Sequence, residues 1–114
     1  MKLEKKIERL TLLLRLDGEL DMQTASTVRQ AIDIEIEKRG IRKVILNFQN
    51  VRFIDSSGLG VIIGRYKKLL PLGGTLKICN VPPQIYRIME LSGLPKIINF
   101  YVDEAQALEE GRGA

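Results

Sequence analysis

The sequence predicts a single α/β domain built on a largely parallel sheet. Its 114 residues, 45% of them hydrophobic, are enough for one core and too few for two. Only three Phe, three Tyr and no Trp are present, so Leu, Ile and Val must fill that core, as is typical of parallel sheets. Strand-like and helix-like segments alternate along the chain, which indicates crossover connections. We expect the domain to span residues 1–110, with residues 111–114 as a flexible tail.

The N-terminal third predicts a hairpin followed by a helix. From Leu10 to Leu16 every second residue is Leu, the two-residue period of a strand with one apolar face. The preceding residues 3–8 fit an antiparallel hairpin arm. The Asp17-Gly18 pair should end the strand. Apolar residues then recur at helical spacing from Thr24, and Gly40 marks the C-terminal stop of this helix.

The rest of the chain repeats the strand–helix alternation. A short apolar run, residues 43–48, predicts a strand buried on both faces, and an extended segment, residues 51–55, leads to the next helix. Proline and glycine then punctuate the remaining elements. We expect helices at residues 57–70, 82–92 and 103–110, and strands at residues 75–79 and 97–101.

The composition argues against an enzyme. No histidine is present, which removes the usual general base of a serine or cysteine hydrolase and the commonest metal ligand. The single cysteine, Cys79, allows neither an internal disulfide nor a thiolate metal cluster. No phosphate-binding loop of the GxxxxGK[ST] type occurs. We therefore expect no catalytic residues, no metal and no cofactor.

Charge and hydropathy argue against nucleic acid and membrane partners. The net charge of +4 comes from 18 Lys and Arg against 14 Asp and Glu, but the basic residues are scattered in pairs near acids, without interleaved aromatic residues. The N-terminus lacks a secretory signal, and no apolar run approaches the roughly 20 residues that span a bilayer. We expect a cytoplasmic protein that binds neither nucleic acid nor membrane directly.

One segment remains distinctive, Asp55-Ser56-Ser57-Gly58-Leu59-Gly60, at the junction of an extended stretch and a helix. Asp and Ser side chains commonly cap the free N–H groups of a helix start, so capping alone can explain one of them. Two adjacent hydroxyls and two glycines need a further reason, because each glycine lowers helix propensity by about 0.8 to 1 kcal/mol. An accessible serine flanked by glycine suits phosphorylation by a partner that binds ATP, and a helix N-terminus tolerates the added charge.

Four segments together resemble the STAS-domain anti-sigma factor antagonists. They are Gly18-Glu19-Leu20-Asp21, the stretch Asp55 to Lys67, Ser92-Gly93-Leu94 and Lys96-Ile97-Ile98. The resemblance covers roughly residues 5–108 in the same order, which makes it far more specific than one motif. It is strongest with the sporulation type that controls sigma-F.

The resemblance implies both a fold and a switch. The STAS fold is a mostly parallel mixed sheet with an N-terminal antiparallel hairpin and about four helices. In the family, the unphosphorylated antagonist binds an anti-sigma factor that is a serine kinase and thereby releases the sigma factor. The kinase, which supplies the ATP, phosphorylates the antagonist and so inactivates it, and a PP2C-type phosphatase restores it.

Carried onto this chain, the resemblance makes Ser56 the phosphorylated residue. It assigns partner binding to a set around that serine, namely Asp21, Asp55, Ser57, Gly58, Leu59 and Gly60. The residues by themselves leave three choices open: Ser56 or Ser57 as acceptor, a capping role for Asp21, and a core position for Leu59.

Three other interpretations are compatible with the sequence. The first is a stand-alone STAS module that binds a nucleotide or a lipid, and the second is a stress-response antagonist of the sigma-B type. The third is an enzyme with Ser56 as nucleophile and Asp55 or Asp21 as base, which we disfavour because carboxylates near their normal pKa are poor bases for a serine hydroxyl.

Overall fold

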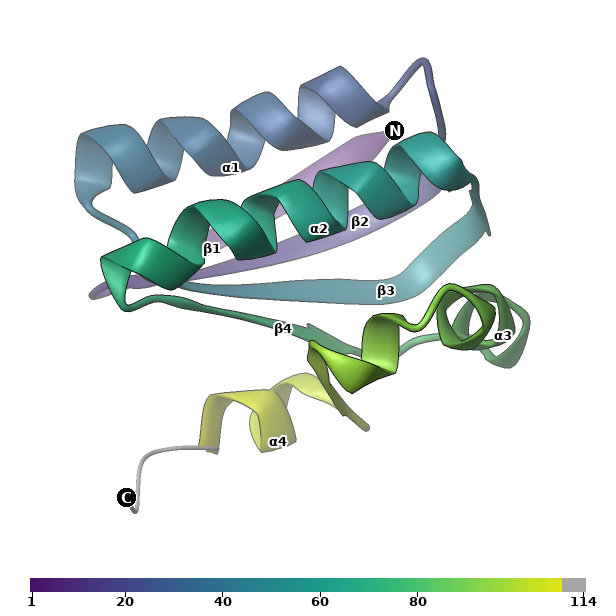
Figure 1. The fold of residues 1–114 in the computed structure, drawn as a ribbon. Coiled ribbons are helices and arrows are strands. Elements are labelled where there is room, and N and C mark those ends of the chain that lie inside the picture. The colour runs from purple at the N-terminus through teal and green to yellow at the C-terminus, as the bar shows by residue number, and fades with distance from the viewer. Residues whose placement is uncertain (110–114) are drawn as a thin grey trace.

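The computed structural model describes residues 1–109, in which strands and helices alternate as the sequence predicts (Figure 1). The predicted flexible tail, residues 111–114, lies outside the described residues. The strands are β1 (Lys2–Glu8), β2 (Thr11–Leu20), β3 (Lys43–Ile54), β4 (Thr75–Cys79) and β5 (Asn99–Tyr101). The α-helices are α1 (Ala25–Arg39), α2 (Ser56–Leu69), α3 (Pro83–Leu91) and α4 (Glu104–Glu109), and short 3-10 turns span Leu70–Leu72 and Leu94–Lys96.

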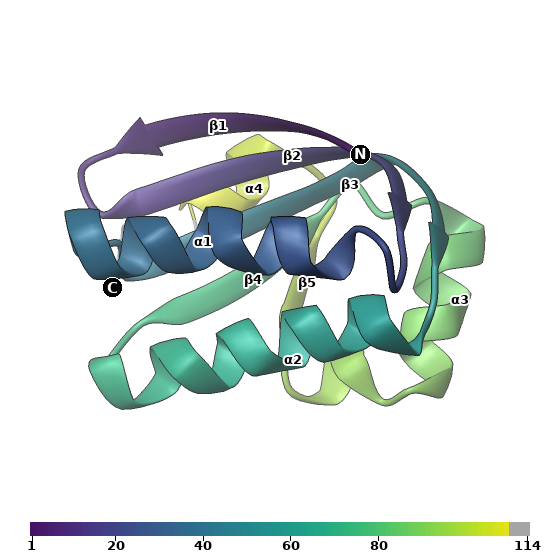
Figure 2. The same cartoon turned by 90° about the horizontal axis from the view of Figure 1, so that it is seen from above.

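Within residues 1–109 the strands form one mixed sheet in the order β1-β2-β3-β4-β5. The β1–β2 pair is antiparallel and every other neighbouring pair is parallel, which confirms the predicted hairpin and sheet type. Helices α1 and α2 cover one face of the sheet, and α4 packs on the opposite face (Figures 1 and 2). The domain is therefore a three-layer α/β arrangement around two apolar layers.

The larger apolar layer lies between the sheet and the α1–α2 face. Alternate residues of β2 enter it, namely Leu12, Leu14 and Leu16, each at most 1% exposed. The smaller layer lies under α4, where Leu13 and Ile45 meet Ala107. Because β3 contributes to both layers, its first half is buried on both faces, as the continuous apolar run predicts.

The prediction that Asp17-Gly18 ends the second strand was wrong. Strand β2 continues to Leu20, which lies opposite Ile54 of β3. Two irregularities in the β2–β3 register flank this region, and Gly18 there adopts a φ of 132°. Only glycine takes that backbone conformation readily, so the glycine makes a bulge in the strand rather than a break. The extension carries β2 to the edge where the candidate site lies.

Candidate functional site

The predicted site residues gather where β2 and β3 end. The two strands are paired up to Leu20 and Ile54, and the Asp55 N–H donates a hydrogen bond to the Leu20 carbonyl at 3.3 Å. The β2–α1 turn, which begins with Asp21, and the β3–α2 turn, which consists of Asp55, are therefore neighbours. In Figure 2, α3 lies beside the start of α2 at this same edge of the sheet.

Asp55 caps helix α2. Its Oδ1 accepts hydrogen bonds from the Ser57 N–H at 2.9 Å and the Gly58 N–H at 3.1 Å. Its backbone carbonyl accepts the first helical hydrogen bond, from the Leu59 N–H at 3.0 Å. One side-chain oxygen thus satisfies two of the N–H groups that a helix start leaves free. The capping role belongs to Asp55, and neither serine is needed for it.

The two serines differ in exposure. Ser56 is the first residue of α2 and is exposed, whereas Ser57 is half-buried. Neither hydroxyl makes a hydrogen bond with another residue among those the structure describes. Exposure gives a physical reason, beyond the family resemblance, to prefer Ser56 as the group that a partner reaches.

The two glycines of the motif have different surroundings. Gly58 is buried, and a Cβ atom built there would lie 2.5 Å from the Leu20 carbonyl oxygen and 2.8 Å from Ile54 Cγ1. A Cβ at Gly60 would meet nothing within 4 Å, and that residue is exposed. Close approach of another molecule is therefore not needed to explain Gly58, because the chain's own β2 strand occupies the space. Gly60 remains on the predicted partner surface.

Asp21 and Leu59 take the positions that the sequence left open. The Asp21 Oδ1 accepts hydrogen bonds from the N–H groups of Gln23 at 2.9 Å and Thr24 at 3.2 Å, so Asp21 stabilises the turn before α1. It is half-buried and remains partly accessible beside Asp55. Leu59 is half-buried and packs against the larger apolar layer. Both residues have structural roles at the site, which does not prevent either from meeting a partner.

Comparison with known protein families identifies the family of this chain. The model of the STAS domain family matches residues 2–107. The chain is a member of the STAS domain family. Among its relatives, the "Anti-sigma F factor antagonist" of Paenibacillus polymyxa is 42% identical over 110 residues, covering 96% of this chain and 94% of the relative. An "Anti-sigma-B factor antagonist" of Bacillus subtilis is 32% identical over 82 residues, covering 72% of this chain and 73% of the relative.

Solved structures of anti-sigma factor antagonists match almost the whole chain. The unphosphorylated form of the anti-sigma factor antagonist SpoIIAA has a TM-score of 0.86 at 29% identity, with 99% of this chain and 98% of that chain covered. SpoIIAA of Bacillus in its phosphorylated form has a TM-score of 0.77 at 28% identity, with 97% and 100% covered. The predicted STAS fold is thus confirmed, and SpoIIAA structures exist in both states of the switch that the sequence suggested.

Two exposed apolar side chains of this STAS domain lie close in sequence to the site residues and were not predicted. Met22 follows Asp21 and is 77% exposed, and Phe53 precedes Ile54 and is 46% exposed. Nothing in the sequence marks Met22. Phe53 could have been identified, because the strand neighbour of a buried residue points to the opposite face of the sheet.

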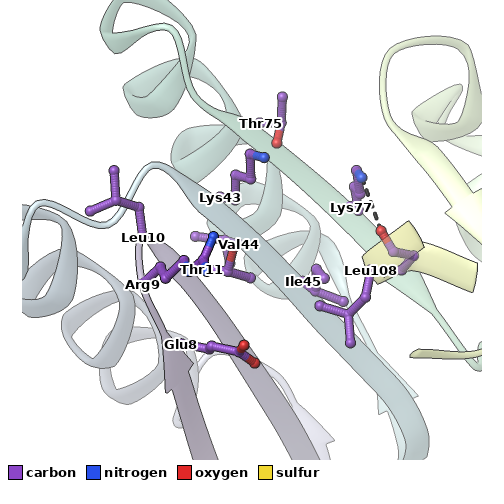
Figure 3. Close-up of a pocket in the computed structure, with 11 residues that line it drawn as sticks. Glu8, Arg9, Leu10, Thr11, Lys43, Val44, Ile45, Thr75, Lys77 and Leu108 are labelled. Carbon is purple, nitrogen blue, oxygen red and sulfur yellow. Dashed lines mark hydrogen bonds between the residues drawn. The ribbon is translucent and has the colours of Figure 1, made fainter. Parts of the chain in front are cut away.

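A hollow of the STAS domain lies at the opposite end of the parallel strands. It has a volume of about 720 Å³ and lies between the β1–β2 turn, the starts of β3 and β4, and the end of α4 (Figure 3). Arg9, Lys43 and Lys77 contribute positive charge to its lining, and Glu8 contributes one carboxylate. Ile45 and Leu108 contribute apolar surface. Lys77 Nζ donates to the Ala107 carbonyl at 3.0 Å. The hollow is separate from the serine site.

The described residues hold no evident metal centre. No group of three or more Cys, Asp or Glu residues within positions 1–109 is arranged to hold a metal ion. Burial, with the nearby Glu104 carboxylate, raises the pKa of the Cys79 thiol to about 12, so it remains protonated and unreactive at neutral pH. No helix in this part of the chain combines the length and apolar character needed to cross a membrane.

Proposed function

We propose that the chain is an anti-sigma factor antagonist of the sporulation, sigma-F type, switched by phosphorylation of Ser56. The unphosphorylated form binds an anti-sigma factor serine kinase in the cytoplasm and releases the sigma factor. The kinase transfers the γ-phosphoryl group of its own ATP to Ser56, which ends the complex, and a PP2C-type phosphatase removes the group. The chain acts as a binding partner and substrate, and catalyses no step itself.

The observation that carries this proposal is the exposed position of Ser56 at the capped start of α2. A kinase needs a hydroxyl that reaches beyond the surface, and Ser56 satisfies this better than the half-buried Ser57. The cap made by Asp55 fixes the backbone on the C-terminal side of the serine. A rigid, accessible hydroxyl presents the kinase with the same geometry in every encounter.

The cap also explains why phosphorylation should change the surface and leave the fold intact. The Asp55 carboxylate already occupies the Ser57 and Gly58 N–H groups, so the phosphoryl oxygens remain directed toward solvent. They add roughly −1.5 to −2 charges beside an existing carboxylate. A partner surface that fits the neutral serine would meet this charge directly.

A kinase assay tests the proposal. The purified chain is incubated with the anti-sigma factor kinase of its own organism and ATP, and intact-mass and peptide mass spectrometry locate the phosphate. We expect one phosphate on wild-type protein, none on Ser56→Ala and one on the matched control Ser57→Ala. Phosphorylation that persists in Ser56→Ala and disappears in Ser57→Ala would assign the switch to the other serine.

A binding assay tests the consequence of phosphorylation. Isothermal titration calorimetry of the same kinase with unphosphorylated and phosphorylated chain should show affinity reduced at least about 100-fold, the loss of about 2.7 kcal/mol. Treatment with a PP2C-type phosphatase should restore it. Equal affinity of both forms would contradict the switch even if the phosphate is on Ser56.

The type of sigma factor is tested by displacement. The 42% identity to a sigma-F antagonist over almost the whole chain, against 32% to a sigma-B antagonist over a shorter stretch, supports the sporulation type. We expect the chain to displace sigma-F from its anti-sigma factor at a lower concentration than it displaces sigma-B. The reverse order would assign it to the stress response.

A second candidate function follows from the hollow at the other end of the sheet. Its volume falls within the range of small-molecule sites, and it combines cationic with apolar lining. This favours a STAS module that binds an anionic small molecule without a kinase. Calorimetry with nucleotides would then show saturable binding that Lys43→Ala weakens, whereas Ser56→Asp would leave partner affinity unchanged.

A further inference from the structure

Strand β1 forms an open edge of the sheet. It is the first strand in the sheet order and pairs with β2 on one side, while the other side pairs with no strand among residues 1–109. Six of its seven residues are exposed, and the seventh is half-buried. Such an edge presents a row of N–H and C=O groups that a further strand can pair with.

The residues of this edge are complementary to themselves when the strand is reversed. We consider two copies of Lys2–Glu8 placed antiparallel with Lys5 at the centre. Lys2 then lies opposite Glu8 of the second copy, and Leu3 opposite Ile7. Glu4 lies opposite Lys6, and the remaining positions repeat these pairs by symmetry. Oppositely charged and apolar pairs directly across an antiparallel ladder each stabilise it by about 0.2 to 1 kcal/mol.

Neighbouring registers lose this match. Two neighbouring registers keep the hydrogen-bonding pattern. With Glu4 at the centre, Lys2 lies opposite Lys6 and Glu4 lies opposite Glu4 of the second copy. With Lys6 at the centre, Lys6 lies opposite Lys6 of the second copy and Glu4 lies opposite Glu8. Both pair like charges across the ladder, which is destabilising. The alternating charges of β1 therefore favour one register with a second copy of this chain.

The centre of this register brings two Lys5 side chains together, and each of them already pairs with a carboxylate of its own chain. Lys5 Nζ lies 2.7 Å from the Glu35 Oε2 of its own α1, whose side chain is only 9% exposed. The hydrogen bond from Lys5, together with Arg39, holds the pKa of the Glu35 carboxyl below its usual range, so Glu35 stays ionised at neutral pH. Each lysine thus has a carboxylate beside it, shared with Arg39, which reduces repulsion across the axis.

We propose that the chain forms a symmetric dimer in which β1 pairs antiparallel with β1 of a second copy about a two-fold axis at Lys5. The five-stranded sheet then continues across the axis into the sheet of the second copy. The interface is one strand wide, so the dimer is weak, with a dissociation constant on the order of 100 µM. The serine site lies at the ends of β2 and β3, outside this interface, and the dimer presents two such sites.

A disulfide trap tests the axis directly. Residues directly opposite in an antiparallel pair have Cα atoms about 4.5 to 5.5 Å apart, which a disulfide can bridge. Only the residue on the axis meets its own copy, so Lys5→Cys should form a disulfide-linked dimer under mild oxidation. Circular dichroism confirms that the variant is folded. The native Cys79 is fully buried and does not compete.

The matched control is Ile7→Cys on the same strand. In the proposed register, residue 7 of each copy is displaced by four residues, about 13 Å, from its counterpart, which is too far for a disulfide. We expect gel electrophoresis without reductant to show dimer for Lys5→Cys and monomer for Ile7→Cys. Dimer in both variants, or in neither, would overturn the proposed register.

Sedimentation of protein without an introduced cysteine measures the self-association independently. Wild-type protein from about 10 µM to about 1 mM should show reversible self-association by sedimentation equilibrium. Glu8→Lys places lysine opposite Lys2 twice in the dimer and should weaken association about fivefold. Adding Lys2→Glu reverses each pair and should restore the wild-type value. A wild-type chain that remains monomeric at 1 mM, or a double variant no better than the single, would overturn the proposal.

Discussion

The β2–α1 turn and the β3–α2 turn begin side by side, and each is stabilised by an aspartate that accepts two backbone N–H groups. They differ in length. The strand β3 ends at Ile54 and α2 begins at Ser56, so a single residue joins them, whereas four residues separate β2 from α1. The short turn restricts the movement of α2 relative to its strand more than the longer turn restricts α1. The predicted phosphorylation site, Ser56, directly follows the short turn.

Packing reinforces this difference. The first turn of α2 lies against β2 so closely that Gly58 has no room for a side chain. Helix α1 instead has a Thr24 hydroxyl between its start and the strand, and this hydroxyl donates to the Glu19 carbonyl at 2.7 Å. The rigid turn fixes the position of the serine, and the longer turn supplies neighbouring polar and apolar surface. A switch that depends on one added charge needs the first property more than the second.

The largest expected effect comes from adding a methyl group to the rigid turn. Gly58→Ala would place its Cβ within 2.5 Å of the Leu20 carbonyl oxygen, so α2 or β2 must shift. We expect the free energy of unfolding to fall by about 2 to 3 kcal/mol, as for an overpacked core. Urea denaturation measures the change.

The matched control is Gly60→Ala in the same helix. Its Cβ meets open space, and alanine has the higher helix propensity, so we expect stabilisation by about 0.5 to 1 kcal/mol. Equal effects of the two substitutions would show that helix propensity, rather than contact with β2, determines the role of Gly58.

The second prediction removes the cap of the rigid turn. Asp55→Ala leaves the Ser57 and Gly58 N–H groups without their side-chain acceptor, and we expect a loss of about 1 to 2 kcal/mol in urea denaturation. Asp55→Asn keeps a capping oxygen and should lose less than half as much. If both variants are as stable as wild type, the packing of Gly58 alone defines the turn.

Most of the fold follows from local signals in the sequence. The helix stop at Gly40 was predicted because glycine at a helix end adopts a positive φ, and the structure gives 69° there. The strand Thr75–Cys79 was predicted with its observed bounds because glycine and proline flank it. The extension of β2 beyond Gly18 was not predicted, because it depends on pairing with β3, which is remote in sequence.

The candidate site was predicted less completely, for a similar reason. The sequence places Asp55 at a helix start, where its type predicts a cap, and the structure bears this out. The sequence does not distinguish Gly58 from Gly60, because only the tertiary approach of Leu20 separates the buried glycine from the exposed one. The position of Phe53 beside Glu19 also depends on the pairing of the two strand ends, which no single segment encodes.

The smallest expected effect on stability lies in the longer turn. Asp21→Ala removes one acceptor, but the Asp21 backbone carbonyl still accepts from the Ala25 N–H at 2.8 Å and the Thr24 hydroxyl still accepts from the Asp21 N–H at 3.0 Å. We therefore expect a loss of only about 0.5 kcal/mol, at the low end for a cap. Urea denaturation of Asp21→Ala and Asp55→Ala side by side would measure the difference in stabilisation between the two turns.

A second substitution at Asp21 distinguishes a role in stabilising the turn from a role in binding the partner. Asp21→Asn keeps an oxygen for the Gln23 and Thr24 N–H groups and removes the negative charge. If Asp21 only stabilises the turn, this variant should bind the anti-sigma factor kinase as wild type does in calorimetry. If its carboxylate pairs with a cation of the partner, affinity should fall about tenfold, or 1.4 kcal/mol, while stability is unchanged. The second result would make the longer turn a part of the partner surface, since its contribution would then exceed what its hydrogen bonds give to the fold.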